Sequence, residues 1–390
     1  MNEIKSNRIQ SIDLLKGLVM VIMALDHTRD YFHNGSFLID PTDPEKTNLA
    51  LFFTRWITHY CAPAFSFLAG ISAWLAGRNK TTKQLSSFLL LRGAWLIFIE
   101  LTIINFAWRF DIHFQSVALQ VIWSLGISMI ILSALIHLQP KYILLFSVAV
   151  ITGHHLLAYL DLSKGILWSI IHQQGVFEIL KGHSVRVIYP IIPWIGVMSL
   201  GYFLGSCYNK NIDPAGRQKL FTIIGACCIA LFVIIRLLNQ YGNAHHWKVY
   251  DGILPTLYSF FNPSKYPPSL TYLLMTLGPV FLFLGTAEKM KGKGVDFFVV
   301  FGRVPFFYYI IHIYMIHLLA MVLAQLTGFG WQAMILKGFV SNSPGLVGYG
   351  VDLWMVYLIW IAIVLLLYPL CKKFSVYKLN HKEKWWVSYL

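Results

Sequence analysis

Runs of about twenty apolar residues recur along the chain, and they constrain its fold more than any other feature. A helix of that length spans the hydrocarbon core of a bilayer, where only helices and closed barrels satisfy their backbone hydrogen bonds. Ten such runs lie at roughly 10–32, 50–77, 85–108, 116–137, 141–160, 187–208, 218–238, 268–287, 304–326 and 350–371. The sequence therefore predicts an all-α integral membrane protein with about ten transmembrane helices, arranged as one polytopic domain over residues 1–390.

The composition supports this class and excludes others. Hydrophobic residues make up 57% of the chain and charged residues 12%, about half the charged fraction of a soluble domain. The net charge of +14 is explained first by basic loops and anionic lipid, so no nucleic-acid partner is expected. The five cysteines lie in or beside apolar runs without metal-ligand spacing, so neither a metal nor a disulfide framework is predicted.

The distribution of basic residues predicts the orientation. With the N-terminus in the cytoplasm, 18 of the 31 Lys and Arg residues fall in cytoplasmic segments and 9 in outer ones. Because positive charge favours the cytoplasmic side, both termini are predicted to be cytoplasmic. The first run lacks a signal-peptide cleavage site and is too long for a signal sequence, so we expect it to remain as the first spanning helix.

Two longer segments interrupt the apolar runs. Residues 161–186 contain "GILWSIIHQQGVFEIL", for which we predict a short amphipathic helix at the membrane interface. The other segment, residues 239–267, is rich in Asn, Tyr, Pro and Gly.

The first run carries a polar stripe. Residues 3, 4, 7 or 11 apart share one face of a helix, and this spacing joins Asp13, Lys16, Met20, Met23, His27 and Asp30. Lys16 and His27 lie roughly 16 Å apart along the axis. Ionisable residues in a membrane helix are expensive and commonly functional. His27, flanked by Asp26 and Asp30, is therefore a candidate catalytic residue, whereas Asp13 and Lys16 could equally form a pair at the membrane rim.

The second run adds basic groups at the same outer rim. Arg55 and His59 are four residues apart in "FTRWITHYCAPAF" and share a face, and Pro63 should kink the helix just beyond them. Together with His27 and His33, they predict a cleft lined by titratable groups.

Other buried polar groups are weaker candidates. His312 and His317 lie beside tyrosines in the ninth run, and such contacts are usually structural, although His312 is the next candidate if the outer rim is not the site. For Arg92 and Glu100 in the third run we expect a structural network.

The stretch "RIQSIDLLKGLVMVIMALDH" resembles the family of the heparan-α-glucosaminide N-acetyltransferase catalytic domain. The resemblance rests on Arg8, Ile12–Asp13, Lys16–Gly17, Met23 and His27, on "PAFSFLAGIS" in the second run, and on the helix count. The stretch also resembles the broader acyltransferase-3 group, whose signature is Arg, ten residues and His; here Lys16 stands in place of the Arg. The lysosomal family member carries its catalytic His in the loop after the first helix, so either His27 or His33 is implied for that role.

The resemblance implies a bacterial cytoplasmic-membrane enzyme that moves an acyl group, acetyl by default, from cytoplasmic acyl-CoA to an extracytoplasmic sugar or glycolipid. His27 would act as base or acyl carrier, Asp26 or Asp30 would orient its imidazole, and Arg55 would stabilise the oxyanion. The implied catalytic residues are His27, Asp26, Asp30, His33, Arg55 and His59. Acetyl-CoA would be held by Lys16, Met20, Met23, Arg78, Lys80, Lys83, Lys289, Lys291, Lys293 and Arg303.

Two other classes remain open from the sequence. A transporter or flippase for an anionic or sugar-linked lipid would also need buried charges, although the chain lacks a matching pair of interrupted helices in two halves. A non-catalytic membrane scaffold is the third possibility. The oligomeric state is open, and a dimer is compatible with the sequence.

Overall fold

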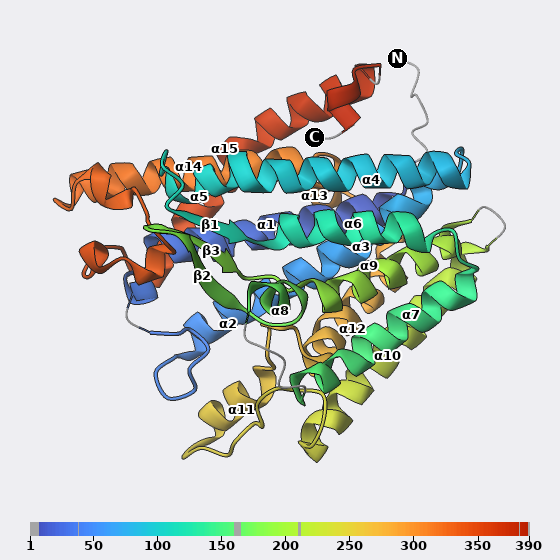
Figure 1. The fold of residues 1–390 in the computed structure, drawn as a ribbon, viewed down its shortest axis with the longest axis horizontal. Helices are drawn as coiled ribbons and strands as arrows, with labels where there is room; N and C mark the ends of the chain where they lie inside the picture. Colours follow the sequence, from blue (N-terminus) through green and yellow to red (C-terminus); the bar gives the residue numbers. More distant parts are fainter. Residues whose placement is uncertain (1–7, 38, 160–164, 210–211, 382, 389–390) are drawn as a thin grey trace.

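The computed structural model describes residues 8–37, 39–159, 165–209, 212–381 and 383–388, and helices dominate them (Figure 1). The α-helices are α1 (Gln10–Phe32), α2 (Leu49–Ile57), α3 (Cys61–Gly77), α4 (Thr82–Ile99), α5 (Asn105–Arg109), α6 (Val121–Leu135), α7 (Pro140–Gly153), α8 (Ile166–Ile171), α9 (Ile191–Gly205), α10 (Pro214–Leu238), α11 (Ile253–Phe261), α12 (Leu270–Ala287), α13 (Lys293–Arg303), α14 (Pro305–Leu326) and α15 (Leu353–Asn380). The strands are β1 (Ser116–Leu119), β2 (Gly175–Leu180) and β3 (His183–Val187).

The all-α membrane class predicted from the sequence is confirmed. Among the described residues, eight helical segments are long and apolar enough to cross a membrane, and each coincides with a predicted run. The other two predicted runs are also helical. They correspond to α1, 23 residues long with charged residues along it, and to the 15-residue α6. The exact number of crossings and the side on which the termini lie remain predictions.

The predicted interfacial helix within residues 161–186 is largely wrong. Residues 161–164 lie outside the described part of the chain, α8 spans only Ile166–Ile171, and the rest forms a hairpin of β2 and β3. β1 pairs in parallel with β3, which gives the sheet order β1-β3-β2. In β3, Ser184 to Val187 alternate polar with β-branched residues, a period-two pattern, and Gly182 takes a positive φ of 78° at the turn. The run predicted to start at 116 therefore begins as a strand, and its helix starts at Val121.

The second run is interrupted earlier than the kink predicted at Pro63. α2 ends at Ile57, a 3₁₀ turn covers Thr58–Tyr60, and α3 starts at Cys61, two residues before Pro63. The turn redirects the chain between two helical segments. It places the face of α2 that carries Arg55 opposite the C-terminal half of α1, since Arg55 contacts Asp26 there.

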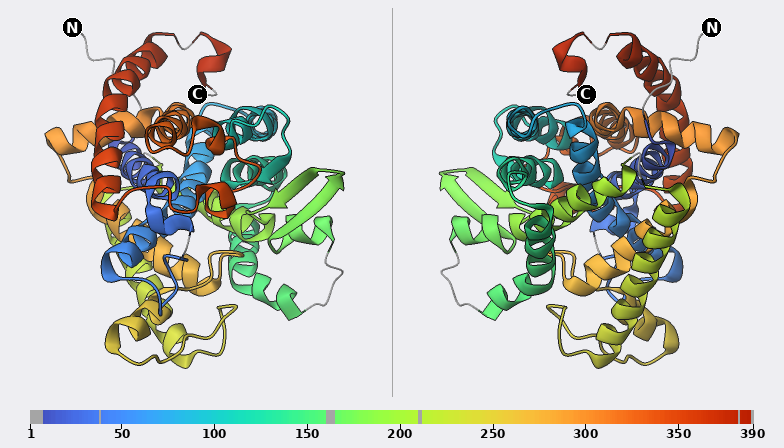
Figure 2. Two further views of the ribbon diagram at one scale, coloured as in Figure 1. Left: turned by 90° about the vertical axis from the view of Figure 1, so that its left-hand side faces the viewer. Right: turned by 90° about the vertical axis from the view of Figure 1, so that its right-hand side faces the viewer.

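Close helix contacts at glycines fix α1 inside the bundle. A Cβ atom at Gly17 would lie 1.8 Å from the carbonyl oxygen of Phe298, and one at Gly302 would lie 1.7 Å from that of Asp13. α1 and α13 therefore touch backbone to backbone, as small residues permit in membrane bundles. α1 also packs on α3, α12, α14 and α15, and 17 of its 23 residues are buried. In the side views, α1 runs through the interior of the bundle (Figure 2).

Candidate active site

Two histidines from distant parts of the chain form the centre of the site. His27 Nδ1 lies 2.8 Å from His312 Nε2, joining α1 to α14. His312 Nδ1 lies 2.9 Å from the carbonyl oxygen of Tyr308. Because a carbonyl only accepts, His312 carries its proton on Nδ1, and in a neutral pair its Nε2 accepts from His27 Nδ1–H. The lone pair of His27 is thereby placed on Nε2.

Packing fixes the plane of the His27 imidazole. Its ring meets Trp108 edge-on at 4.7 Å between centroids and stacks on His312 at 5.1 Å. A cavity of about 50 Å³ adjoins the ring. It is lined by Met23, Asp26, His27, Thr58, Cys61, Ala62, Phe65, Gln120, Val121, Tyr189, Lys265 and Tyr309. Among the candidate catalytic residues, His27 and Asp26 line this cavity.

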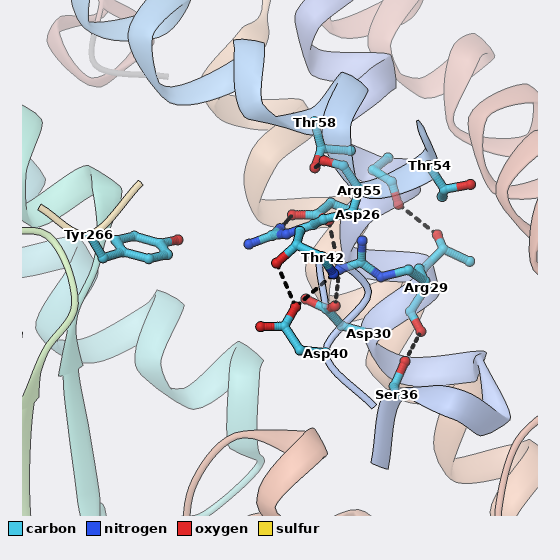
Figure 3. Close-up of polar contacts among 12 residues, drawn as sticks. Asp26, Arg29, Asp30, Ser36, Asp40, Thr42, Thr54, Arg55, Thr58 and Tyr266 are labelled. Atoms are coloured by element: carbon cyan, nitrogen blue, oxygen red, sulfur yellow. Dashed lines mark hydrogen bonds and ion pairs between the residues drawn. The ribbon is translucent and has the colours of Figure 1, made fainter. Parts of the chain in front are cut away.

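The acidic residues beside His27 bind arginines. Asp26 Oδ2 accepts from Arg55 Nη1 at 2.5 Å, and Asp26 Oδ1 lies 2.8 Å from Arg29 Nη2 (Figure 3). Asp30 Oδ1 accepts from the same Arg29 nitrogen at 2.5 Å. The carboxylates of Asp26 and Asp30 thus bind arginines, and the group in contact with His27 Nδ1 is His312. A role of either aspartate in orienting the imidazole stays a prediction.

A longer groove runs along the N-terminal half of α1. It has a volume of about 270 Å³ and is mostly apolar, with Lys16 and Arg92 among its lining residues. The lining consists of Lys16, Met20, Met23, Phe65, Ala69, Ser72, Ala73, Ala76, Phe88, Leu89, Arg92, Leu96, Val121, Ile122, Leu125, Met129, Pro305, Phe306 and Tyr309. Lys16 Nζ donates to Ser72 Oγ at 2.7 Å. The groove and the His27 cavity share Met23, Phe65, Val121 and Tyr309, so they adjoin.

A third, polar cavity lies beyond the C-terminal half of α1. This vestibule has a volume of about 450 Å³ and includes the predicted Arg55 and His59. Its other lining residues are Asp40, Thr42, Pro44, Gln174, Arg236, Asn243, His245, His246, Trp247, Tyr250, Ser259, Asn262, Pro263, Ser264, Lys265 and Tyr266. Lys265 lines both the vestibule and the His27 cavity. The three cavities thus follow one another from the N-terminal to the C-terminal half of α1.

The two other predicted histidines lie outside the His27 cavity. His33 directly follows α1. Its backbone N–H donates to the carbonyl oxygen of Arg29, and its backbone forms an isolated parallel β-bridge with Val351. Burial, followed by the charge of Arg29, lowers the pKa of His33. His59 is buried in the 3₁₀ turn with its ring against Tyr272 at 5.6 Å, and it lines the vestibule.

The residues predicted to bind the donor are only partly brought together. Lys16, Met20 and Met23 line the groove. Lys80 Nζ lies 5.4 Å from the Phe88 ring, which belongs to that lining.

The remaining donor candidates lie elsewhere. Arg78 donates to the carbonyl oxygen of Tyr208 and lines a separate cavity with Arg217 and Glu288. Arg303, at the end of α13, is half-buried. Exposed side chains outside the groove lining are those of Lys83, Lys289, Lys291 and Lys293. Their part in donor binding stays a prediction. Within the described residues, no group of three or more His, Cys, Asp or Glu is arranged to hold a metal ion.

Sequence reasoning ranked some site residues too low or missed them. His312 was a secondary candidate, and the structure pairs it with His27. Arg92 was expected to be structural but lines the groove. Lys265 was not among the predicted site residues, although it lines the His27 cavity. The only sequence feature that distinguished Lys265 was its place beside Tyr266 in a Pro-containing loop. The residue spacing in the sequence did not indicate that this loop lies close to α1.

These cavities and the contact between half-buried His27 and buried His312 define a polytopic helical membrane protein with a polar centre at the end of an apolar groove. The family model described as "Heparan-alpha-glucosaminide N-acetyltransferase, catalytic" matches residues 8–235. The match covers more than half of the chain, so the chain belongs to this family and is a transmembrane acetyltransferase. His27 and Arg55 lie within the matched residues, whereas Lys265 and His312 lie beyond them. No curated protein matches the chain.

Proposed function

We propose that the protein transfers an acyl group, acetyl in the simplest case, from cytoplasmic acyl-CoA to a sugar or glycolipid on the opposite side of a bacterial cytoplasmic membrane. The observation that carries this proposal is the succession of three neighbouring cavities with shared lining residues, the middle one of which is lined by His27. An apolar groove beginning near Lys16 adjoins the His27 cavity, which in turn adjoins a polar vestibule. A donor and an acceptor can therefore approach His27 from opposite ends.

The groove suits the acyl-CoA arm. Lys16 and Arg92 offer positive charge to the donor's phosphates at one end, where charge-assisted hydrogen bonds are strong. Met20 and Met23 offer an adaptable apolar lining for the extended pantetheine chain. In this proposal the thioester lies near Met23, because the groove meets the His27 cavity there.

His27 supplies the base. Its Nε2 lone pair, set by the hydrogen bond from Nδ1 to His312, takes the proton from the acceptor hydroxyl or amine as the acceptor attacks the thioester carbon. The protonated imidazole then returns this proton to the leaving CoA thiolate. His312 positions His27, in the way that the third member of a triad orients the base.

The vestibule suits a sugar acceptor. Trp247, Tyr250 and Tyr266 provide ring faces, and amide groups come from Gln174, Asn243 and Asn262. The family description names a glucosaminide as its substrate, so glucosamine is the first acceptor to test.

The test is release of CoA from acetyl-CoA by the purified protein in lipid vesicles, with glucosamine or extracted membrane lipid as acceptor. We expect release that depends on the acceptor and is lost in His27→Ala. A transporter or a scaffold would release none. Absence of release with every acceptor, despite a folded protein, would reject the acyltransferase proposal.

A further inference from the structure

Lys265 occupies the junction between the cavity that holds His27 and the outer vestibule. It lines both cavities, whereas Arg55 lines the vestibule alone. A side chain at this junction faces the place where, in the proposed function, the acceptor enters and meets the thioester.

The loop that carries Lys265 is held in place on both sides. The backbone N–H of Ser264 donates to Asn243 Oδ1 at 2.8 Å, and that of Ser269 donates to the carbonyl oxygen of Ser264 at 2.9 Å. Next to Lys265, the Tyr266 ring meets Tyr189 edge-on at 5.4 Å, and Tyr189 lines the His27 cavity. The loop is therefore anchored to the wall of that cavity, so the position of Lys265 is constrained.

Within the described residues, the Lys265 ammonium contacts an aromatic ring and not an acid: its Nζ lies 5.3 Å from the centroid of the Tyr266 ring. Asp26, the acidic residue in the same cavity, is engaged by both Arg29 and Arg55. Among the residues that the structure describes, no carboxylate lies within ion-pair distance of Lys265. Arg55 was first expected to stabilise the oxyanion. Its Nη1 instead donates a hydrogen bond of 2.5 Å to Asp26 Oδ2.

We propose that Lys265 is a catalytic residue that stabilises the oxyanion formed from the thioester carbonyl; this inference rests on the proposed function. As His27 Nε2 removes the acceptor proton, the acceptor atom bonds to the carbonyl carbon and the C=O pair moves onto oxygen beside the Lys265 ammonium. Collapse of this intermediate re-forms the C=O bond and breaks the C–S bond. The CoA thiolate leaves and takes the proton from His27. A fixed cation in a site shielded from water favours the charge that develops in this step.

The test compares Lys265→Met, Lys265→Arg and the matched control Lys248→Met, which removes an exposed charge from the same segment. CoA release from acetyl-CoA is measured with glucosamine as acceptor. Lys265→Met should lower kcat by about 10²–10³-fold and leave KM for acetyl-CoA nearly unchanged. Lys265→Arg should retain more activity than Lys265→Met, and Lys248→Met should match the wild type.

A second variant distinguishes loss of activity caused by loss of the positive charge from loss caused by misfolding. Lys265→Cys should be inactive, and alkylation with 2-bromoethylamine should restore activity by rebuilding a cationic side chain. A neutral thiol reagent should not restore it, and treated wild-type protein controls for the exposed Cys227. If the wild type is active but Lys265→Met retains its kcat, or only KM for the acceptor changes, this inference is rejected while the proposed function stands. If the wild type itself releases no CoA, the proposed function fails first.

Discussion

His27 and His312 are 285 positions apart in the chain, yet their ring nitrogens lie 2.8 Å apart. The Tyr308 carbonyl fixes the His312 tautomer, and His312 in turn fixes that of His27. This chain of contacts leaves a lone pair on His27 Nε2, and from it we predict how variants of the two histidines behave.

His27→Ala should reduce acetyl transfer by about 10²–10⁴-fold, the usual contribution of a positioned base. His312→Ala should reduce it less, because the base remains but its tautomer and orientation are no longer fixed. The double variant should be no worse than His27→Ala, since residues that act as one unit are not additive. The measurement is kcat for CoA release. Independent, multiplying losses would contradict the coupling of the two rings.

Acetyl-CoA binding tests the groove. Lys16→Met removes a cation that lines it, and losing one hydrogen bond to a charged group should raise Kd by about tenfold or more. Binding should also become less sensitive to salt. Lys291→Met tests the alternative donor site, because Lys291 is exposed and lies outside the groove lining; Lys219→Met, which removes an exposed charge that is not among the predicted donor-binding residues, is the matched control. A larger effect in Lys291→Met than in Lys16→Met would move the donor to the exposed α12–α13 loop.

The contact between α1 and α13 is a separate, purely structural test. Gly17→Ala places a Cβ where the Phe298 carbonyl oxygen lies, so the helices must separate. Overpacking of this kind costs about 1–3 kcal/mol, which should appear as a lower thermal midpoint in detergent. Gly294→Ala, in α13 but with nothing within 4 Å of its Cβ position, should leave the midpoint unchanged or raise it. Equal midpoints for Gly17→Ala and wild type would contradict the close contact.

The membrane helices could be predicted from the sequence because a helix that spans the bilayer needs about 20 consecutive apolar residues, and such runs are easily recognised. The β2–β3 hairpin was missed because its two strands are short and lie in a segment whose apolar residues also fit a helix. The sequence predicted Asp26 and Arg55 at the same outer rim of the membrane, but it did not predict the ion pair between them. The pairing of His27 with His312, and the position of Lys265, depend on how α1, α14 and a distant loop pack. Periodicity within one helix says which face a residue occupies but not which helix that face meets.

The membrane orientation remains to be measured. Reporter fusions after Lys83 and after Lys265 should report opposite sides, with Lys83 in the cytoplasm. This arrangement would place the Lys16 end of the groove toward cytoplasmic acyl-CoA and the vestibule outside. Two fusions that report the same side would contradict the topology, and with it the direction of transfer.

His33 provides the last test, because it separates a structural histidine from a catalytic one. Burial and the charge of Arg29 lower the pKa of His33 in the folded protein from its ordinary value of 6.5. As the pH falls through that value, the unfolded chain binds a proton that the folded chain excludes. The stability that the neutral imidazole contributes is therefore complete above pH 6.5 and is lost on the acidic side.

The thermal midpoint in detergent should accordingly fall between pH 7.5 and 5.5, and it should fall less in His33→Gln. His183→Gln, which replaces an exposed histidine in β3, should behave as the wild type does. His33→Gln should also keep most of its transfer activity, because His33 lies outside the lining of the His27 cavity. If a folded His33→Gln variant loses transfer while His27→Ala keeps it, the base lies in the loop after α1, and the His27–His312 pair is structural.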